Sequence, residues 1–379
     1  MKKLLLVFGT RPEAIKMCPL VGELRRRAGL ETEVCVTGQH RGMLDQVLEI
    51  FGVVPDYDLD IMREGQSLSY VTAAVLTRLG AVLDRAKPDA VLVHGDTASA
   101  FAAALACFYR RIPVGHVEAG LRTYDLARPF PEEFDREALA LLSFWHFAPT
   151  PAAARNLLRE GRAASSVFVT GNTVVDAMRR TVRADFRHPD LDWAGEKRLL
   201  FVTAHRRENL GAPMRGMFRA IRRVLREHPD CRAILPLHRN PLVRRIAAEE
   251  LGGCGQIRLV EPLDVLSCHN LEARCTLCLT DSGGVQEECA GLGRPTLVMR
   301  GTTERPEGVE AGILRLVGTE EESVYRHASE LLDDPAAYAA MARVRCPFGD
   351  GCAWERIADL LETGRCEPWT GPSESLARD

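Results

Sequence analysis

The 379-residue sequence lacks several features that mark particular classes of protein. No stretch approaches the roughly 18 consecutive apolar residues of a membrane-spanning helix. The formal net charge is -3, so the chain has no excess of positive charge with which to bind nucleic acid. It contains neither the G-x-G-x-x-G pattern of a dinucleotide site nor the G-x-x-x-x-G-K-[ST] pattern of a P-loop. These absences argue against a membrane protein, a nucleic-acid binder, an NAD enzyme and a P-loop protein.

A secretion signal and a metal-binding cysteine pattern are also missing. The apolar run Leu4–Phe8 is too short for a signal peptide and is expected to form a buried strand. The 12 cysteines are therefore expected to stay reduced. Cys275 and Cys278 form a CxxC, but no second pair stands at a metal-ligand spacing, so we expect them in the core. We expect a cytoplasmic protein without a metal or other cofactor.

Short apolar segments alternate with amphipathic helical segments along almost the whole chain. The apolar segments are rich in Val, Leu and Ile without polar alternation, which is typical of parallel strands buried on both faces. In the first half they are Leu4–Phe8, Glu33–Thr37, Ala90–Val93, Val114–Val117, Trp145–Ala148 and Val167–Thr170. In the second half they are Leu199–Val202, Ala233–Leu237, Ile257–Val260, Leu277–Thr280, Thr296–Met299 and Leu314–Val317. The alternation predicts two Rossmann-like, doubly wound α/β domains with parallel sheets and a cleft between them.

A polar, turn-rich segment, HPDLDWAGEK, separates the two series of strands. We expect an N-terminal domain of residues 1–171 and a C-terminal domain of residues 172–351. A last helical pattern, residues 352–365, follows the glycine-rich FGDG turn and is expected to pack back on the N-terminal domain. Residues 366–379 are expected to form a tail.

Polar side chains follow many of the predicted strands, at the edge where open parallel sheets bind ligands. They are Arg11 with Lys16, Asp96, Glu118, His205, His238 and Ser282. Several such residues in each half, all at the predicted functional edge, indicate one ligand site in the cleft between the domains.

Ser282, Gly283 and Gly284 begin a predicted helix. Small residues there expose backbone N–H groups, and a helix N-terminus favours an anion such as a diphosphate. The alternative is a serine N-cap with a tight glycine turn. Four cations on other loops favour the diphosphate. They are Arg11, Lys16, His205 and Arg305.

The acids at the strand ends need a separate explanation. Asp96 and Glu118 end buried strands, where a carboxylate is costly without a partner or a task. A pair of carboxylates in a cleft suits general acid–base work, because burial and neighbouring charge set their pKa values apart. Glu132 and Glu133 begin a helix, and for Glu133 we expect only complementation of the helix dipole. His205 is a candidate general acid or a candidate hydrogen-bond donor to a phosphate. Three other histidines are expected to be structural: His94, His116 and His269.

Ten motifs, in order over nearly the whole chain, resemble those of the bacterial non-hydrolysing UDP-N-acetylglucosamine 2-epimerases. They are FGTRPEAIKMCPL, TGQHRGMLDQVL, VLVHGDT, PVGHVEAGLRT, PEE, TGNTVVDA, TAHRREN, LTDSGGVQEE, TTERPEG and FGDG. The resemblance implies a GT-B-like fold with a closing C-terminal helix. It also implies interconversion of UDP-GlcNAc and UDP-ManNAc, usually by a homodimer, for bacterial surface polysaccharides.

The resemblance assigns roles residue by residue. It implies acid–base work for Asp96, Glu118 and Glu132, with His205 near the diphosphate. It implies UDP contacts for Arg11, Lys16, His238, Ser282, Gly283, Gly284, Glu288 and Arg305. A region that binds a second, activating UDP-GlcNAc in many members matches Gln39, His40 and Gln66.

Some positions depart from the family pattern. Cys268 stands where an aromatic residue would stack on the uracil, which weakens the expected uracil contact. Gly42 and Gly65 stand where some members carry longer polar side chains, which bears on the activating site. Cys289 and Gly301 replace an expected alanine and aspartate and touch none of the proposed acids.

Four alternative functions share these features. A hydrolysing relative would release free ManNAc and UDP, and a close variant would act on a modified UDP-HexNAc. A GT-B glycosyltransferase would need an acceptor site and often a basic, apolar membrane-facing patch, which the sequence lacks. A binding protein without catalysis would be expected to have lost at least one of Asp96, Glu118 and Glu132.

Overall fold

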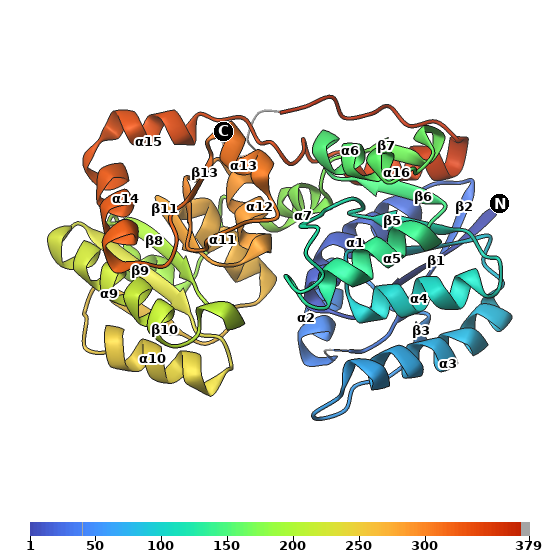
Figure 1. Ribbon diagram of the computed structural model, residues 1–379, viewed down its shortest axis with the longest axis horizontal. Coiled ribbons are helices and arrows are strands. Elements are labelled where there is room, and N and C mark those ends of the chain that lie inside the picture. The colour runs from blue at the N-terminus through green and yellow to red at the C-terminus, as the bar shows by residue number, and fades with distance from the viewer. Residues whose placement is uncertain (40, 373–379) are drawn as a thin grey trace. The chain divides into compact units, whose positions relative to one another are not determined.

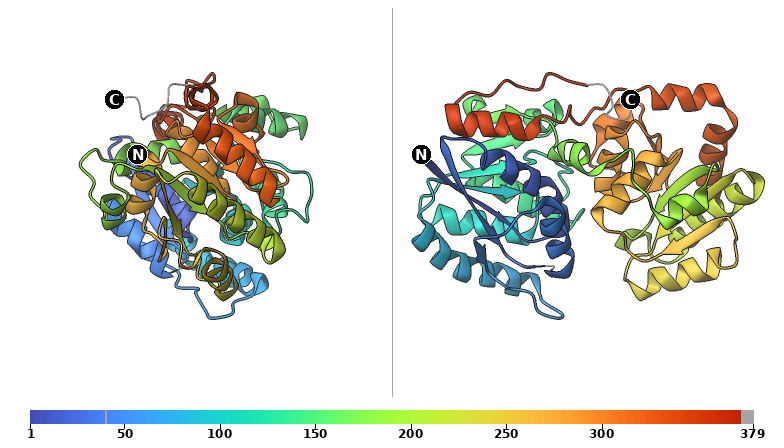
Figure 2. Two further views of the ribbon diagram at one scale, coloured as in Figure 1. Left: turned by 90° about the vertical axis from the view of Figure 1, so that its left-hand side faces the viewer. Right: turned by 180° about the vertical axis from the view of Figure 1, so that it is seen from behind.

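The computed structural model describes residues 1–39 and 41–372, which fold into two compact α/β units. Unit 1 comprises Met1–Ala177 and Gly349–Gly371, and the body of unit 2 is Met178–Phe348. Each unit contains one sheet with helices on both of its faces (Figures 1 and 2). None of the helices in this part of the chain has the length and apolarity needed to span a bilayer. The predicted fold class, two doubly wound parallel sheets, is confirmed.

The sheet of unit 1 has seven parallel strands in the order β3-β2-β1-β4-β5-β6-β7. The strands are β1 (Lys2–Phe8), β2 (Leu30–Val36), β3 (Tyr57–Asp58), β4 (Ala90–His94), β5 (Val114–Val117), β6 (Trp145–Ala148) and β7 (Val167–Val169). Every residue of β4 and β5 is buried, because helices cover both faces of the sheet there. This double burial explains why their sequences show no polar alternation.

Helices of unit 1 begin at recognisable caps. Ser67, Thr97 and Thr150 each accept a backbone N–H three residues on, which starts the helix that follows. The helices are α1 (Arg11–Leu24), α2 (Arg41–Phe51), α3 (Leu68–Ala86), α4 (Ala98–Phe108), α5 (Glu132–Leu142), α6 (Pro151–Arg159), α7 (Thr173–Thr181) and α16 (Ala353–Thr363), with a 3-10 turn at Ala164–Ser166. Helices α3, α4 and α5 pack in succession over one face, and α1, α2 and α16 over the other.

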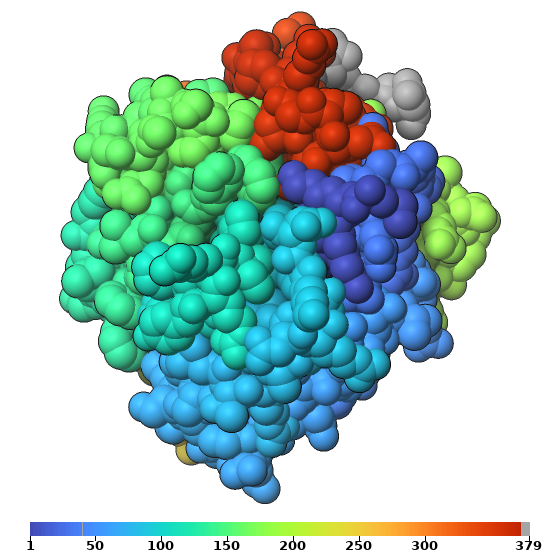
Figure 3. Space-filling model, turned by 90° about the vertical axis from the view of Figure 1, so that its right-hand side faces the viewer, coloured from blue at the N-terminus to red at the C-terminus, as the bar shows by residue number. Residues whose placement is uncertain are grey.

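The C-terminal helix α16 packs on α1 within unit 1. Arg27 forms an ion pair with Asp359 at 2.8 Å, and Lys2 donates to the carbonyl of Leu361 at 3.4 Å. Figure 3 shows this segment, in red, against the N-terminal strand, in dark blue. Trp369, beyond the helix, is 5% exposed, and its backbone N–H donates to the carbonyl of Val169 at 2.8 Å. The chain is thus held to unit 1 past the end of α16.

The sheet of unit 2 has six parallel strands in the order β10-β9-β8-β11-β12-β13. They are β8 (Arg198–Thr203), β9 (Cys231–Pro236), β10 (Ile257–Val260), β11 (Leu277–Thr280), β12 (Thr296–Val298) and β13 (Leu314–Leu316). The helices are α8 (Pro189–Ala194), α9 (Ala212–Glu227), α10 (Pro241–Leu251), α11 (Val265–Arg274), α12 (Gly283–Gly291), α13 (Pro306–Ala311), α14 (Glu321–Asp333) and α15 (Pro335–Ala342), with a 3-10 turn at Arg207–Asn209. Helices α9, α10 and α14 form one layer, and α11, α12 and α13 the other.

Candidate functional site

Asp96 lies in the turn that joins β4 to α4. The turn needs Gly95 in the left-handed region, at φ 67°, before Thr97 caps the helix. The Asp96 carboxylate is 2.8 Å from the guanidinium of Arg136 on α5. Its side chain is 27% exposed, whereas that of Arg136 is 5% exposed. The acid is therefore oriented by a buried cation while remaining open to solvent on one side.

Glu118 follows β5 in a strained backbone conformation. Its φ of 67° lies in the left-handed region, which costs a residue other than glycine about 1–2 kcal/mol. Its buried carboxylate forms an ion pair with Lys16 and accepts from the side-chain amide of Asn172 at 3.3 Å. His94 Nε2 is 3.7 Å from the same oxygen. Strain that fixes the direction of a buried acid is a mark of functional sites.

Two predicted diphosphate contacts lie in α1 of unit 1. Arg11 begins the helix and is partly exposed. Lys16 is 6% exposed and pairs with Glu118. The structure therefore brings Lys16 together with one of the proposed acids, Glu118.

Glu132 and Glu133 begin α5 and have different surroundings. Glu132 Oε2 is buried and has no hydrogen-bond partner among the described residues. Glu133 is fully buried and accepts the backbone N–H groups of Thr123 and Tyr124, each at 2.8 Å. The helix-dipole interpretation of Glu133 was thus incomplete, because its carboxylate also holds the loop that precedes α5.

Asp135, which the sequence analysis did not single out, joins two of the proposed acids electrostatically. It lies three residues after Glu132, on the same face of α5, and is 4% exposed. Burial, with further contributions from Asp96 and Glu132, raises the pKa of Asp135 to about 7. Asp96, Glu132 and Asp135 therefore form one group of interacting carboxyls, which we call the acid cluster.

The raised pKa of Asp135 predicts a pH-dependent stability. Its folded-state pKa of about 7 exceeds the usual unfolded value of about 3.9, so the folded state holds the proton more tightly. The resulting stabilisation is complete below pH 4 and is lost as the pH rises through 7. Asp135→Asn removes the titration. The unfolding free energy of the variant minus that of wild type should therefore be about 2 kcal/mol larger at pH 8.5 than at pH 5. Urea unfolding at both pH values measures this difference.

A matched control is Asp84→Asn, which removes an exposed carboxylate paired with Arg110. It should change stability little at either pH, because exposed ion pairs contribute little. An Asp135→Asn effect of the same size at pH 5 and pH 8.5 would contradict the assignment.

Glu13 is a second residue that the sequence analysis missed. It is 2% exposed and accepts the backbone N–H groups of Gly9 and Thr10 at 3.0 and 2.7 Å. Its other oxygen accepts the hydroxyl of Thr97 at 2.7 Å. Burial raises the pKa of Glu13, and these hydrogen bonds oppose the rise. Glu13 thus ties the loop that bears Arg11 to the turn that bears Asp96.

His94 and His116 behave as the structural histidines that the sequence predicted. Burial lowers the pKa of His94 to about 4 and that of His116 to about 3. His116 Nε2 is 2.7 Å from the carbonyl of Gly95 and so supports the turn next to Asp96.

Two of the three residues proposed for the activating site lie together. The side-chain amide of Gln66 donates to the carbonyl of Gln39 at 3.0 Å, and Ser99 donates to the Gln39 side chain at 2.7 Å. His40 lies outside the described residues. Gly42 and Gly65 both have open space where a side chain would begin.

In unit 2 the loop that bears His205 is held by a buried acid. Asp281, at the end of β11, is fully buried and accepts the backbone N–H groups of His205 and Arg206 at 3.1 and 3.0 Å. It also accepts the side-chain amide of Asn209 at 3.0 Å. From the sequence, Asp281 could be placed at a strand end, but its positioning role could not be predicted.

His205 and His238, predicted from two different loops, lie in contact. Their rings stack with centroids 5.4 Å apart and an interplanar angle of 14°. Burial lowers the pKa of both histidines, while Asp281 opposes the shift. At neutral pH they therefore favour the uncharged form, which can donate one hydrogen bond and accept another.

The first turn of α12 combines small residues with a cation. Ser282 is the N-cap residue of α12, as the alternative expected, but among the described residues its side chain makes no capping hydrogen bond. The Arg305 guanidinium lies directly over Gly283. A Cβ atom added at Gly283 would be 2.7 Å from Arg305 Nη1, which shows how close the two residues are. Backbone N–H groups at a helix N-terminus next to a guanidinium have the chemistry that suits a diphosphate.

Arg305 is held by acids as well as facing the helix. Its Nε donates to Glu287 at 2.9 Å, and its Nη1 is 3.5 Å from Glu304. Both acids are almost fully buried, with side-chain exposures of 1% and 3%. The guanidinium is therefore fixed in place before any ligand arrives.

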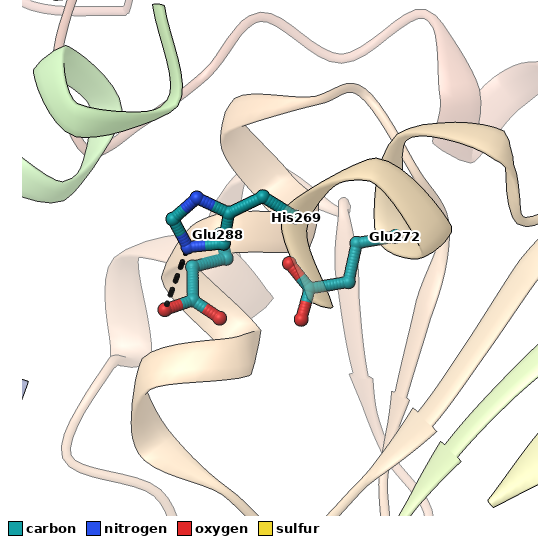
Figure 4. A group of neighbouring side chains, drawn as sticks. All are labelled: His269, Glu272 and Glu288. Atoms are coloured by element: carbon teal, nitrogen blue, oxygen red, sulfur yellow. Dashed lines mark ion pairs between the residues drawn. The ribbon is translucent and has the colours of Figure 1, made fainter. Parts of the chain in front are cut away.

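Glu288, another predicted UDP contact, lies one turn into α12. Its carboxylate is 3.6 Å from Nε2 of His269 on α11 (Figure 4). Cys275 and Cys278 lie in the apolar core beside these helices, as the sequence predicted.

Two doubly wound parallel sheets, one bearing an acid cluster and the other an arginine held over the first turn of a helix, are the architecture of a GT-B-like enzyme of nucleotide-sugar chemistry. A family model described as UDP-N-acetylglucosamine 2-epimerase matches residues 22–362, and the chain belongs to this family. It is 53% identical to the UDP-N-acetylglucosamine 2-epimerase of Bacillus subtilis, over 95% of this chain and 94% of the relative.

Comparison with solved structures supports the same family assignment. S. aureus MnaA, in a co-structure with UDP, has a TM-score of 0.92 and 47% identity, with 98% of this chain and 100% of that chain covered. The UDP-GlcNAc 2-epimerase from Neisseria meningitidis, bound to UDP-GlcNAc, has a TM-score of 0.89 and 43% identity, with 95% and 99% covered.

Proposed function

We propose that the chain interconverts UDP-GlcNAc and UDP-ManNAc by inverting carbon C2 of the sugar without net hydrolysis. The observation that carries the proposal is the set of acids in unit 1. Asp96 and Glu118 follow two neighbouring strands and Glu132 begins α5, and each is oriented or buried by its neighbours. The names of the relatives support the substrate, since one was solved with UDP and another with UDP-GlcNAc.

The chemistry of the substrate limits the route. The C2–H bond of the sugar is not adjacent to a carbonyl, so simple deprotonation is unfavourable. In the proposed route a base removes the C2 proton while the bond from C1 to the diphosphate oxygen breaks, which leaves a C1–C2 double bond and UDP. An acid then protonates C2 on the opposite face, and a diphosphate oxygen of UDP attacks C1 again. The enzyme must therefore supply a base, an acid and a firm hold on UDP.

The residues of the two units divide this work. Asp96, Glu118 and Glu132 are the proposed acid and base groups. His205, His238 and Arg305 stabilise the charge that develops on the departing diphosphate. The remaining proposed UDP contacts are Arg11, Lys16, Ser282, Gly283, Gly284 and Glu288.

Proton NMR of the purified protein with UDP-GlcNAc in D2O tests the function. UDP-ManNAc should appear, with deuterium at C2 in both sugars, because the C2 proton exchanges with solvent. Free ManNAc with UDP would instead assign the chain to the hydrolysing enzymes. No change without an added acceptor would favour a glycosyltransferase or a binding protein.

Cys268→Phe should tighten UDP binding. Cys268 lies on α11 and is partly buried, and the family resemblance places an aromatic ring at this position against the uracil. A stacked ring contributes about 1 kcal/mol, so the affinity measured by titration calorimetry should rise about fivefold. Cys254→Phe, at a partly buried cysteine after α10, should have no such effect. Unchanged affinity in Cys268→Phe would place this residue away from the uracil.

A homodimer is proposed as well, supported by apolar side chains exposed on and beside α3, α4 and α5. They are Leu68, Phe108, Phe130, Phe134 and Leu141. Light scattering should give twice the 41.9 kDa of one chain. Phe108→Glu should lower that mass towards a single chain, and a monomeric wild-type protein would contradict the proposal.

The nucleotide-sugar chemistry of the relatives supports the cytoplasmic location expected from the sequence.

A further inference from the structure

Three side chains from two helices of unit 2 converge beside the apolar core. His269 and Glu272 lie on the same face of α11, three residues apart, and Glu288 lies on α12. One ligand atom from each lies within 4.8 Å of the other two. Figure 4 shows the imidazole and the two carboxyl groups facing one another. We call these three residues the His–Glu–Glu cluster.

Glu272 is the least expected member of the cluster. Its side chain is fully buried, and its Oε2 has no hydrogen-bond partner among the described residues. Among the residues that the structure describes, no lysine or arginine forms an ion pair with Glu272. A second carboxylate, Glu288, lies beside it and adds negative charge. Two neighbouring carboxyl groups, one fully buried and one partly buried, are costly unless a proton or a cation compensates them.

The imidazole of His269 is oriented to complete the cluster. Its Nδ1 is 2.7 Å from the hydroxyl of Thr181, and its Nε2 is directed at the carboxylate of Glu288 at 3.6 Å. A histidine that binds a metal through one nitrogen usually has the other nitrogen held by such a hydrogen bond. The thiol of Cys268 is 3.2 Å from Glu272 Oε1 and adds a soft ligand at the edge of the cluster.

We propose that His269, Glu272 and Glu288 bind a divalent transition-metal ion, with zinc as the best match to their chemistry. One imidazole and two carboxylates form a ligand set that suits zinc, which binds such atoms at about 2.0–2.2 Å. The thiol of Cys268 or a water molecule takes the fourth position. This site was not expected from the sequence, where the cysteines show no second pair at a metal-ligand spacing, because the cluster combines one histidine with two glutamates from different helices.

Zinc binding to the nucleotide-free protein tests the site. The protein is stripped with EDTA, dialysed and titrated with Zn2+ alone against a chromophoric chelator. Wild type should bind one more zinc ion per chain than Glu272→Gln, or bind it more than about tenfold more tightly. Zinc should raise the melting temperature of wild type and leave that of Glu272→Gln unchanged. Glu272→Gln keeps the volume of the side chain and removes its charge, so the variant should fold without zinc.

Two control variants separate the cluster from other ligands. Cys254→Ser removes a partly buried thiol elsewhere in unit 2, and Glu250→Gln removes a carboxylate paired with Arg215. Both should bind zinc as wild type does. X-ray absorption should show nitrogen or oxygen neighbours at about 2.0–2.2 Å. Equal binding by wild type and Glu272→Gln, or a shell made only of sulfur, would overturn the proposal. The first result would leave a shared proton to compensate the two carboxyls.

A consequence for the nucleotide rests on the proposed function. Glu288 is also a proposed UDP contact, so zinc and UDP should compete for it. Saturating UDP should weaken zinc binding at least about threefold, and the same titration with Glu272→Gln should show no competition. Because the direct zinc titration contains no nucleotide, its outcome does not depend on whether the proposed epimerase activity is found.

Discussion

Replacing Asp96 with asparagine should lower kcat by at least about a thousandfold, while UDP affinity changes by less than about tenfold. Asparagine keeps the size and the hydrogen bond to Arg136 but cannot take or give a proton in the reaction. The side chain lies in unit 1, and most of the proposed diphosphate contacts lie in unit 2. Steady-state kinetics and UDP titration calorimetry measure the two effects separately.

The control for Asp96→Asn is again Asp84→Asn, which changes an exposed carboxylate at the end of α3. Its kcat should stay within about twofold of wild type, because Asp84 pairs only with Arg110 on the surface. Comparable kcat values for Asp96→Asn and wild type would remove Asp96 from the mechanism. A large loss of UDP affinity instead would make it a binding residue.

Arg305→Met should weaken UDP binding by about a hundredfold or more and also lower the stability of unit 2. The guanidinium lies over Gly283, where the proposed diphosphate binds, and it compensates the buried carboxylates of Glu287 and Glu304. Removing one partner of a buried ion pair costs about 3–5 kcal/mol, because the remaining charge is left without compensation. Calorimetry measures the affinity, and urea unfolding followed at a unit 2 probe measures the stability.

Two further variants separate the binding effect from the structural one. Arg315→Met removes a partly exposed arginine paired with Glu330 and should change neither quantity appreciably. Gly283→Ala keeps the ion pairs but inserts a methyl group against the guanidinium, so it should weaken UDP binding more than it lowers stability. A normal UDP affinity in Arg305→Met would show that this residue serves the fold alone.

The strands could be predicted from the sequence because they are buried on both faces. Every strand except β3 overlaps an apolar segment identified before the structure, since a doubly covered strand needs a continuous run of Val, Leu and Ile. Strand β3 has only Tyr57 and Asp58, at the edge of the sheet, and two residues give no run to recognise. The family motifs suggested which residues belong to the site, but not which of them touch.

The residues that the sequence analysis missed act through other residues. Glu13 and Asp281 each hold a loop by accepting backbone N–H groups, and no motif chemistry distinguishes such an acid from a catalytic one. Asp135 becomes unusual only through burial beside Asp96 and Glu132. The His–Glu–Glu cluster depends on how α11 and α12 pack, which spacing along the chain does not encode.

The return of the chain to unit 1 has a consequence for how the protein folds. Helix α16 completes the surface of α1, yet all of unit 2 lies between them in the sequence. The chain re-enters unit 1 at Gly349, close to the point where it leaves. A Cβ atom added at Gly349 would lie 3.1 Å from the backbone nitrogen of Asn172, near the end of the first segment of unit 1. A folded unit 2 thus acts as a short tether for α16, whereas an unfolded one is a long, flexible loop. The entropy of closing such a loop is about 4 kcal/mol, so melting unit 2 should also weaken the attachment of α16 to α1.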